Sequence, residues 1–264
     1  MNTAPERWGD LGTRLGSGAV LIAIGIACIW AGGAVFHGLM AAICALMVWE
    51  LVRMLMPAVP GMALRLGAIS GAGVLLASYL PVIYALPVLL AAVLVGLGQV
   101  SRLVPVYIGF AALVLLAGWG MAHVRDDLGV GWMVWLVLIV VVTDIAGYFA
   151  GRTFGGPKFW PSVSPKKTWS GTSAGWVVSA LVGLAFGMQT GDIAALMVAS
   201  VFLSFASQLG DIAESAIKRK VGVKDSSSLI PGHGGLLDRF DGMMGAALAL
   251  LALEVALGFP WSAL

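Results

Sequence analysis

The chain consists mostly of apolar stretches, each about as long as a bilayer-spanning helix, separated by short polar breaks. Of its 264 residues, 60% are hydrophobic and 11% are charged, and the mean hydropathy is +0.98. A soluble chain of this length would have too few polar side chains to cover its surface. The sequence therefore predicts an integral membrane protein. The net charge of +2 gives no indication of nucleic-acid binding.

The apolar stretches predict an all-α fold, a polytopic bundle of about nine transmembrane helices, because a bilayer core needs about 20 apolar residues per helix. The spans are expected near residues 18–34, 37–55, 63–79, 82–99, 103–122, 130–151, 170–188, 192–214 and 242–259. Very short turns are expected between the first two spans and between the third and fourth.

The distribution of lysine and arginine predicts the orientation in the membrane. With a cytoplasmic N-terminus and nine alternating spans, 14 of the 15 basic residues fall in cytoplasmic segments, and only Arg125 falls outside. We expect a multi-pass protein of the cytoplasmic (inner) membrane. Both long polar loops, about 152–169 and 215–241, then lie on the cytoplasmic face. The predicted organisation is an N-terminal set of helices, 1–130, followed by a catalytic region, 131–264.

A carboxylate interrupts the predicted span at Asp144, where an ionisable group costs several kcal/mol unless it is paired or faces water. Tyr148 and Arg152 follow at intervals of four and share its helix face. Intramembrane ionisable groups indicate a functional site by default. The alternative is a buried Asp–Arg pair that only holds helices together.

Two further carboxylates, Asp211 and Glu214, are three residues apart near the end of the eighth predicted span. Glu214 precedes Lys218 by four residues, a spacing typical of a helix salt bridge. Asp211 has no such partner along the sequence and is the better candidate for a metal ligand.

A third pair, Asp238 and Asp241, begins the last span directly after the glycine-rich segment 231–235. Carboxylates at a helix N-terminus can be simple caps. The glycine-rich turn instead favours close approach of an anion to backbone N–H groups. Together with Asp211, these carboxylates would offer the hard oxygen ligands that Mg²⁺ prefers.

The first polar loop contains Ser164, Lys166, Lys167 and Thr168, which offer positive charge and hydroxyl donors. This group could bind phosphates, or it could be a basic patch that meets anionic lipid. Elsewhere, Glu50 is expected to form an ion pair with Arg53 at the membrane edge. The carboxylate of Glu254 has no predicted role.

From the residues alone, two classes of protein stay open: a membrane phosphotransferase and a transporter. A CDP-alcohol phosphotransferase is not favoured, because the residues after Asp241–Gly242 break its pattern. A transporter would have polar sites near the midplane and internal repeats, whereas the polar groups here gather toward the predicted cytoplasmic side.

The segment SAIKRKVGVKDSSSLIPGHGGLLDRFD, residues 215–241, resembles the signature of the phosphatidate cytidylyltransferases, the CDP-diacylglycerol synthases. The segment from Asp144 to Arg152 and the S-P-K-K-T element at 164–168 also resemble family motifs. Ser170 stands where many members have Glu or Gln, and Ser227 stands where Gly is usual. The matching positions of the signature are Ser215, Lys218, Arg219, Lys224, Asp225, Ser227, Ile230, Pro231, His233, Gly234, Gly235, Asp238, Arg239 and Asp241.

The resemblance implies an integral membrane enzyme, commonly a homodimer, that converts CTP and phosphatidic acid to CDP-diacylglycerol and pyrophosphate with Mg²⁺. One or two metal ions are expected on Asp211, Asp238 and Asp241, with Asp144 completing the cluster. His233 is expected to donate to a phosphate or to protonate pyrophosphate. The basic residues expected to neutralise the substrate phosphates are Lys166, Lys167, Lys218, Arg219, Lys224 and Arg239. The remaining residues expected to bind substrate are Arg152, Ser164, Thr168, Ser215, Gly234 and Gly235.

Overall fold

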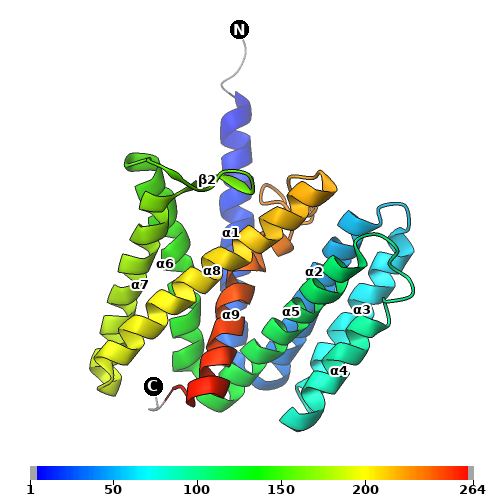
Figure 1. Cartoon of the computed structure of the whole chain (residues 1–264), viewed down its shortest axis with the longest axis horizontal. Helices are drawn as coiled ribbons and strands as arrows, with labels where there is room; N and C mark the ends of the chain where they lie inside the picture. The colour runs from blue at the N-terminus through cyan, green and yellow to red at the C-terminus, as the bar shows by residue number, and fades with distance from the viewer. Residues whose placement is uncertain (1–4, 261–264) are drawn as a thin grey trace. The chain divides into compact units, whose positions relative to one another are not determined.

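The computed structural model describes residues 5–260, with the side chains of residues 5–11 and 13–15 outside that description. Arg7 and Arg14, which the orientation count assigns to the cytoplasm, are among those side chains. Helices make up most of the described chain (Figure 1). They are α1 (Pro5–Ala31), α2 (Gly33–Leu55), α3 (Pro60–Ala77), α4 (Val82–Leu94), α5 (Val104–His123), α6 (Val130–Thr153), α7 (Trp169–Thr190), α8 (Ile193–Val221) and α9 (Leu237–Leu257). A π-helical turn, η1 (Val124–Leu128), extends α5.

Each predicted span coincides with one of these helices. Seven of them are long and apolar enough to cross a membrane. The other two apolar segments, Gly16–Ala31 and α4, are shorter within the described residues. The prediction of an all-α polytopic membrane protein is therefore confirmed.

The second polar loop is shorter than predicted, because α8 continues to Val221 and α9 begins at Leu237. Ser215, Lys218 and Arg219 therefore lie on a helix and not in a loop. The ion pair from Lys218 to Glu214, one helical turn apart, supports this last part of α8. Gly222 ends the helix with φ of 82°, a conformation that favours glycine.

The first polar loop holds a small antiparallel hairpin of β1 (Lys158–Trp160) and β2 (Ser164–Thr168), where the sequence predicted only a loop. Thr168 then caps α7, since its hydroxyl accepts a hydrogen bond from Gly171 N at 3.2 Å. The hairpin thereby leads directly into α7.

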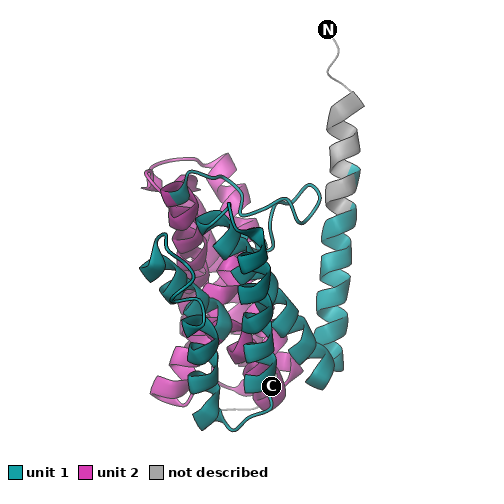
Figure 2. Cartoon of the chain, turned by 90° about the vertical axis from the view of Figure 1, so that its right-hand side faces the viewer, with its two compact units in different colours: residues 1–115, 221–239 teal, residues 116–220, 240–264 magenta. Residues whose placement is uncertain are grey.

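The chain forms two compact units (Figure 2). Unit 1 comprises residues 1–115 and 221–239, and unit 2 comprises residues 116–220 and 240–264. In unit 1, α3 packs closely on α2 through glycines: a Cβ at Gly67 would lie 2.6 Å from the carbonyl oxygen of Ala45. Small residues of this kind let membrane helices approach closely.

In unit 2, α6 and α7 cross with similarly close backbones, since a Cβ at Gly171 would lie 2.5 Å from the carbonyl oxygen of Gly147. Buried hydroxyls add polar links between helices. Thr143 on α6 hydrogen-bonds Ser179 on α7 at 2.9 Å and Ser204 on α8 at 2.7 Å. Such links orient α6, α7 and α8, which carry most of the polar residues of this unit.

Candidate functional site: an acidic cluster beside a polar pocket

Three carboxylates of unit 2 gather where α8 and α9 cross. Asp211 and Glu214 on α8 and Asp241 on α9 each offer an oxygen, and these oxygens lie within 4.8 Å of one another. Two oxygens bound to one Mg²⁺ at about 2.1 Å lie at most about 4.2 Å apart. Small side-chain adjustments therefore suffice for this group to hold a divalent cation, and its all-oxygen donor set suits a hard ion.

Glycines bring the carboxylates together. The backbone carbonyl of Asp241 approaches Gly210 so closely that a Cβ there would collide with it, and Gly245 meets Ala206 in the same way. Because Gly210 directly precedes Asp211, this crossing fixes the distance between the two aspartates. The sequence predicted Asp211 and Asp241 as ligands but did not show that two glycines would join their helices.

Lysines flank the cluster on both sides. Lys167 of β2 places Nζ 2.6 Å from Oδ2 of Asp211, and Lys218 forms the predicted ion pair with the fully buried Glu214. Ser215 donates a further hydrogen bond to Asp211 at 3.2 Å. Three carboxylates facing two ammonium groups leave one formal negative charge, which favours a bound cation.

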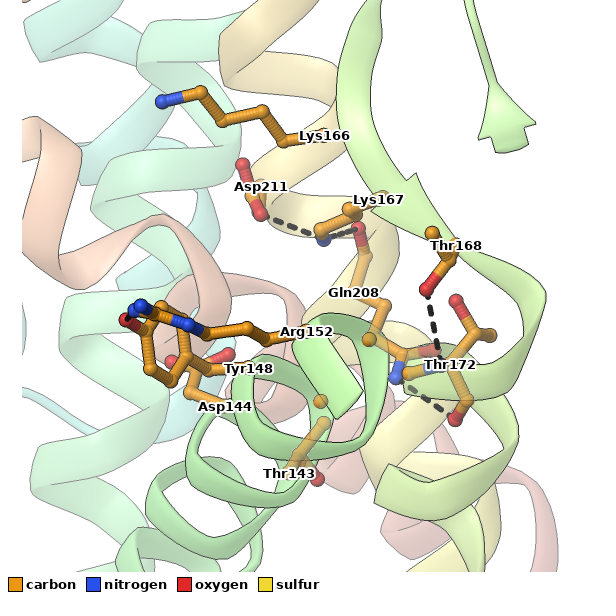
Figure 3. A pocket seen from close by; sticks show the side chains of 13 residues that line it. Thr143, Asp144, Tyr148, Arg152, Lys166, Lys167, Thr168, Thr172, Gln208 and Asp211 are labelled. Atoms are coloured by element: carbon orange, nitrogen blue, oxygen red, sulfur yellow. Dashed lines mark hydrogen bonds and ion pairs between the residues drawn. The ribbon is translucent and has the colours of Figure 1, made fainter. Parts of the chain in front are cut away.

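A polar pocket of about 390 Å³ opens beside Asp211, between α6, β2, α7 and α8 (Figure 3). Asp144 lines it from α6. Lys167 reaches into the pocket toward Asp211, while the amine of Lys166 extends in another direction. The pocket thus combines negative and positive groups, which suits an anionic substrate carried with a metal ion.

Arg152 binds Tyr148, the residue one helical turn before it on α6. Its Nη1 donates to the Tyr148 hydroxyl at 2.7 Å, and both side chains are exposed at the pocket edge. The predicted stripe of Asp144, Tyr148 and Arg152 does line one pocket wall. The guanidinium retains N–H donors beyond this bond, so an anion can bind there.

Gln208 is a pocket residue that the sequence reasoning missed. Its amide is held on two sides: Trp176 donates to Oε1 at 3.1 Å, and Nε2 donates to the Thr172 carbonyl at 3.2 Å. The spacing of three residues from Asp211 on α8 was the available signal, because it puts both side chains on one helix face.

The signature loop, residues 222–236 between α8 and α9, belongs to unit 1 and forms a tight turn at residues 230–234. Ile230 N donates to Gly234 O at 2.8 Å, and His233 N donates to Ile230 O at 2.9 Å. Arg239 fixes the turn through two hydrogen bonds to the His233 carbonyl, from Nε at 3.0 Å and Nη2 at 2.6 Å. The predicted phosphate-binding Arg239 is thus also a structural donor in this loop.

Asp238 serves the loop in a similar way. Its Oδ2 accepts hydrogen bonds from Gly235 N at 2.8 Å, Ser226 N at 3.0 Å and Ser226 Oγ at 3.0 Å. These donors satisfy that oxygen in the manner of a capping box. A helix cap was one of the two roles that the sequence allowed for Asp238, the other being a metal ligand. In the candidate metal cluster of unit 2, Glu214 is the third carboxylate beside Asp211 and Asp241.

The prediction for Glu50 is wrong. Its side chain is fully buried and accepts hydrogen bonds from the signature loop, including one from Leu237 N at 2.6 Å. The guanidinium of Arg53 instead lies 5.0 Å from the ring centroid of Trp49. Helical spacing alone indicated an ion pair, but the loop supplies more and better donors from a distant part of the sequence.

Glu254, which had no predicted role, binds His123. The imidazole lies between two carboxylates, with Nε2 2.9 Å from Glu254 Oε1 and Nδ1 2.7 Å from Asp127 Oδ2. This contact joins η1, α5 and α9 within unit 2. No sequence pattern pointed to it, because the partners are 131 residues apart.

The predicted site residues fall into one group in each unit. The group of unit 1 contains Lys224, His233, Gly234, Gly235, Asp238 and Arg239. The group of unit 2 contains Asp144, Arg152, Ser164, Lys166, Lys167, Thr168, Asp211, Ser215, Lys218, Arg219 and Asp241. Arg219 and Lys224 are exposed, whereas Thr168 is buried and its hydroxyl is used as a helix cap.

Comparisons with known proteins agree with the chemistry of these groups. A model of the cytidylyltransferase family matches residues 12–256. A curated phosphatidate cytidylyltransferase of Brucella suis is 43% identical over 150 residues, which are 54% of this chain and 53% of the relative. One of Helicobacter pylori is 41% identical over 134 residues, 49% of each chain. One of Staphylococcus epidermidis is 44% identical over 119 residues, 44% of this chain and 46% of the relative.

The chain spans about half the length of the curated relatives it matches. The family match, in contrast, extends over nearly all of this chain. On that match, and on the acidic and basic groups that accompany it, the chain belongs to the cytidylyltransferase family.

Proposed function

We propose that the chain is a phosphatidate cytidylyltransferase, which transfers the cytidylyl group of CTP to phosphatidic acid and gives CDP-diacylglycerol and pyrophosphate. The observation that carries this proposal is the acidic cluster of Asp211, Glu214 and Asp241 beside a polar pocket that contains Lys167. The relatives of Brucella suis and Helicobacter pylori carry that enzyme name, which supports the choice of substrates.

In the proposed reaction, a phosphate oxygen of phosphatidic acid attacks the α-phosphorus of CTP in line. The bond from that phosphorus to the bridging oxygen breaks, and pyrophosphate leaves with the electron pair. A phosphomonoester has its second pKa near 6, so the acceptor is already an anion at neutral pH and needs no strong base. Catalysis then depends on positioning and on neutralising charge.

Mg²⁺ is the metal proposed for the acidic cluster, with Asp211 and Asp241 as its main protein ligands and Asp144 as a further carboxylate on the pocket wall. When bound, the ion would supply positive charge to the triphosphate oxygens. Glu214 keeps Lys218 in place through their ion pair. Asp238, which the sequence predicted as a ligand, is instead proposed to hold the loop through its Oδ2.

The basic side chains are assigned to substrate phosphates. Lys167 and Arg152 line the pocket and are proposed to bind the triphosphate. Ser164, Lys166 and Thr168 belong to the same β2 element. The other residues proposed to bind phosphate are Lys218, Arg219, Lys224, His233, Arg239, Ser215, Gly234 and Gly235.

The apolar helices agree with a multi-pass membrane protein. We propose the cytoplasmic membrane as its location and the cytoplasm as the side that holds the active site, because the basic residues concentrate in segments of that predicted side. A homodimer, and a division into residues 1–130 and a catalytic region 131–264, belong to the same proposal.

The test follows label from α-³²P CTP into chloroform-extractable lipid. Membranes that contain the protein would receive phosphatidic acid with and without Mg²⁺, alongside Asp211→Asn, Asp241→Asn and the control Glu254→Gln. We expect Mg²⁺-dependent labelling in the wild type and the control, and at least a hundredfold loss in both aspartate variants. Folded, inserted protein that labels no lipid would contradict the proposal, and solute flux into proteoliposomes would then test transport.

A further inference from the structure

Glu50 lies outside the signature segment, residues 215–241, yet its carboxylate accepts hydrogen bonds from residues of that segment. The side chain is 0% exposed and belongs to α2 in unit 1. Oε1 accepts from Ser227 Oγ at 2.5 Å and from Leu236 N at 2.9 Å. Oε2 accepts from Leu237 N at 2.6 Å and from Ser226 Oγ at 3.1 Å.

A buried carboxylate is costly unless hydrogen bonds replace its lost water. Here three donors serve Glu50 alone: the Ser227 hydroxyl and two backbone N–H groups at the start of α9. The Ser226 hydroxyl is shared between Glu50 and Asp238. These N–H groups have no partner within the helix, and the positive end of the helix dipole favours a negative charge. Glu50 therefore caps α9 from another helix, α2.

The same carboxylate is linked to the signature aspartate. Ser226 Oγ lies 3.1 Å from Glu50 Oε2 and 3.0 Å from Asp238 Oδ2, so one hydroxyl joins the two acidic groups. The backbone between them has no room for a side chain: a Cβ at Gly235 would collide with Ser226 Oγ and would lie 2.6 Å from Glu50 Oε1. The second glycine of the Gly234–Gly235 pair thus makes room for the contact between Ser226 and Glu50.

We propose that Glu50 is a positioning residue for cytidylyl transfer, which holds the glycine-rich turn and the start of α9 in the conformation that receives substrate phosphate. This inference rests on the proposed function. Glu50 touches no substrate; it acts through Ser226, Ser227 and the two amides. It explains why a fully buried carboxylate stands in the last turns of an apolar helix far from the signature in sequence.

The substitution Glu50→Gln tests this most sharply. Each carboxylate oxygen accepts from one backbone N–H, so either orientation of the amide places an NH₂ group against an N–H donor. The serine hydroxyls can turn, but the backbone cannot. The start of α9 should therefore leave its position while the volume of the side chain is preserved.

The kinetic expectation is a split between KM and kcat. If the competent loop conformation falls to about a tenth of molecules, the KM for CTP rises about tenfold, while kcat at saturating CTP stays within about threefold. Loss of folded protein would instead lower kcat at unchanged KM. Amide hydrogen exchange at Leu236 and Leu237, measured without substrate, should become at least tenfold faster.

Two further variants keep the result interpretable. Glu254→Gln alters another carboxylate that joins helices, since Glu254 binds His123, and its KM for CTP should equal that of the wild type. Ser227→Ala removes one donor and leaves the charge, so it should raise KM in the same direction by a smaller factor, and it carries the test if Glu50→Gln does not fold.

The outcomes separate the two proposals. An active wild type whose KM and loop exchange are unchanged in Glu50→Gln and Ser227→Ala overturns the role of Glu50 alone. A folded wild type that produces no labelled lipid overturns the proposed function and this inference with it. A raised KM together with faster exchange at Leu236 and Leu237, both absent from Glu254→Gln, supports the inference.

Discussion

The ammonium of Lys167 lies 2.6 Å from Oδ2 of Asp211, which joins the β-hairpin to the acidic cluster within unit 2. The same ammonium donates to the Gln208 carbonyl at 3.2 Å. One lysine therefore neutralises a proposed metal ligand and lines the pocket at once. In the adjacent Lys166, the amine extends in another direction (Figure 3).

Replacing Lys167 by Gln should lower kcat/KM for CTP by about ten- to a hundredfold, because a charge-assisted contact to phosphate is worth about 1.5–3 kcal/mol. The matched control is Lys158→Gln, which changes an exposed lysine of the same hairpin that has no assigned role. Lipid labelling at several CTP concentrations measures both. Equal losses of kcat/KM in the two variants would show that Lys167 does not bind the phosphates of CTP.

Asp238 and Asp241 should respond differently to substitution, although they are three residues apart in one signature. Asp241→Asn removes a member of the acidic cluster and should raise the Mg²⁺ concentration for half-maximal activity by tenfold or more. Asp238→Asn should leave that concentration within about twofold. It should instead speed hydrogen exchange at Ser226 and Gly235, because the N–H groups of these residues donate hydrogen bonds to Asp238 Oδ2.

An Mg²⁺ titration of both variants, with the exchange measurement on the same preparations, decides the assignment. A shift of the Mg²⁺ requirement in Asp238→Asn comparable to that in Asp241→Asn would return Asp238 to the metal site, as the sequence had predicted.

Much of this architecture follows from local sequence. Apolar length predicts the spans, and the i, i+4 pair of Glu214 and Lys218 is formed as expected. Asp211 and Asp241 could be predicted as a pair because a carboxylate in an apolar span is costly and therefore indicates a functional site. These inferences rely on spacing within one helix or on composition.

What could not be predicted depends on contacts between distant segments. The partners of Glu50 lie 176 to 187 residues away, and those of Glu254 lie on helices whose arrangement no spacing reveals. The closeness of Arg53 to Glu50 in the sequence therefore led to the wrong prediction of an ion pair. Close helix crossings at glycines decide which polar groups meet, and sequence periodicity does not show where such crossings occur.

His233 of the glycine-rich turn has a partner on α1. Ser17 Oγ lies 3.1 Å from the Pro231 carbonyl, to which it donates, and 2.9 Å from His233 Nδ1. With the hydroxyl hydrogen so used, His233 Nδ1 donates to Ser17 Oγ, and this contact fixes the orientation of the imidazole. Ser17→Ala should thus lower activity about three- to tenfold.

Ser17→Thr keeps the hydroxyl and should restore activity to within about twofold of the wild type. The comparison is made by lipid labelling at saturating CTP and phosphatidic acid. If alanine and threonine behave alike, the hydroxyl contact has no influence on His233.

The crossing of α6 and α7 allows a stability prediction with an internal control. A Cβ at Gly171 would lie 2.5 Å from the Gly147 carbonyl oxygen, a distance that forces the helices apart, whereas a Cβ at Gly147 would lie 3.5 Å from the Gly171 carbonyl oxygen, an ordinary contact. Overpacking of a close contact costs about 1–3 kcal/mol. Gly171→Ala should therefore lower the Tm of the detergent-solubilised protein by several degrees, while Gly147→Ala should leave it nearly unchanged, since alanine also favours the helix. Thermal unfolding followed by size-exclusion chromatography measures both variants, and equal Tm values for the two would mean that the helices cross less closely than this geometry requires.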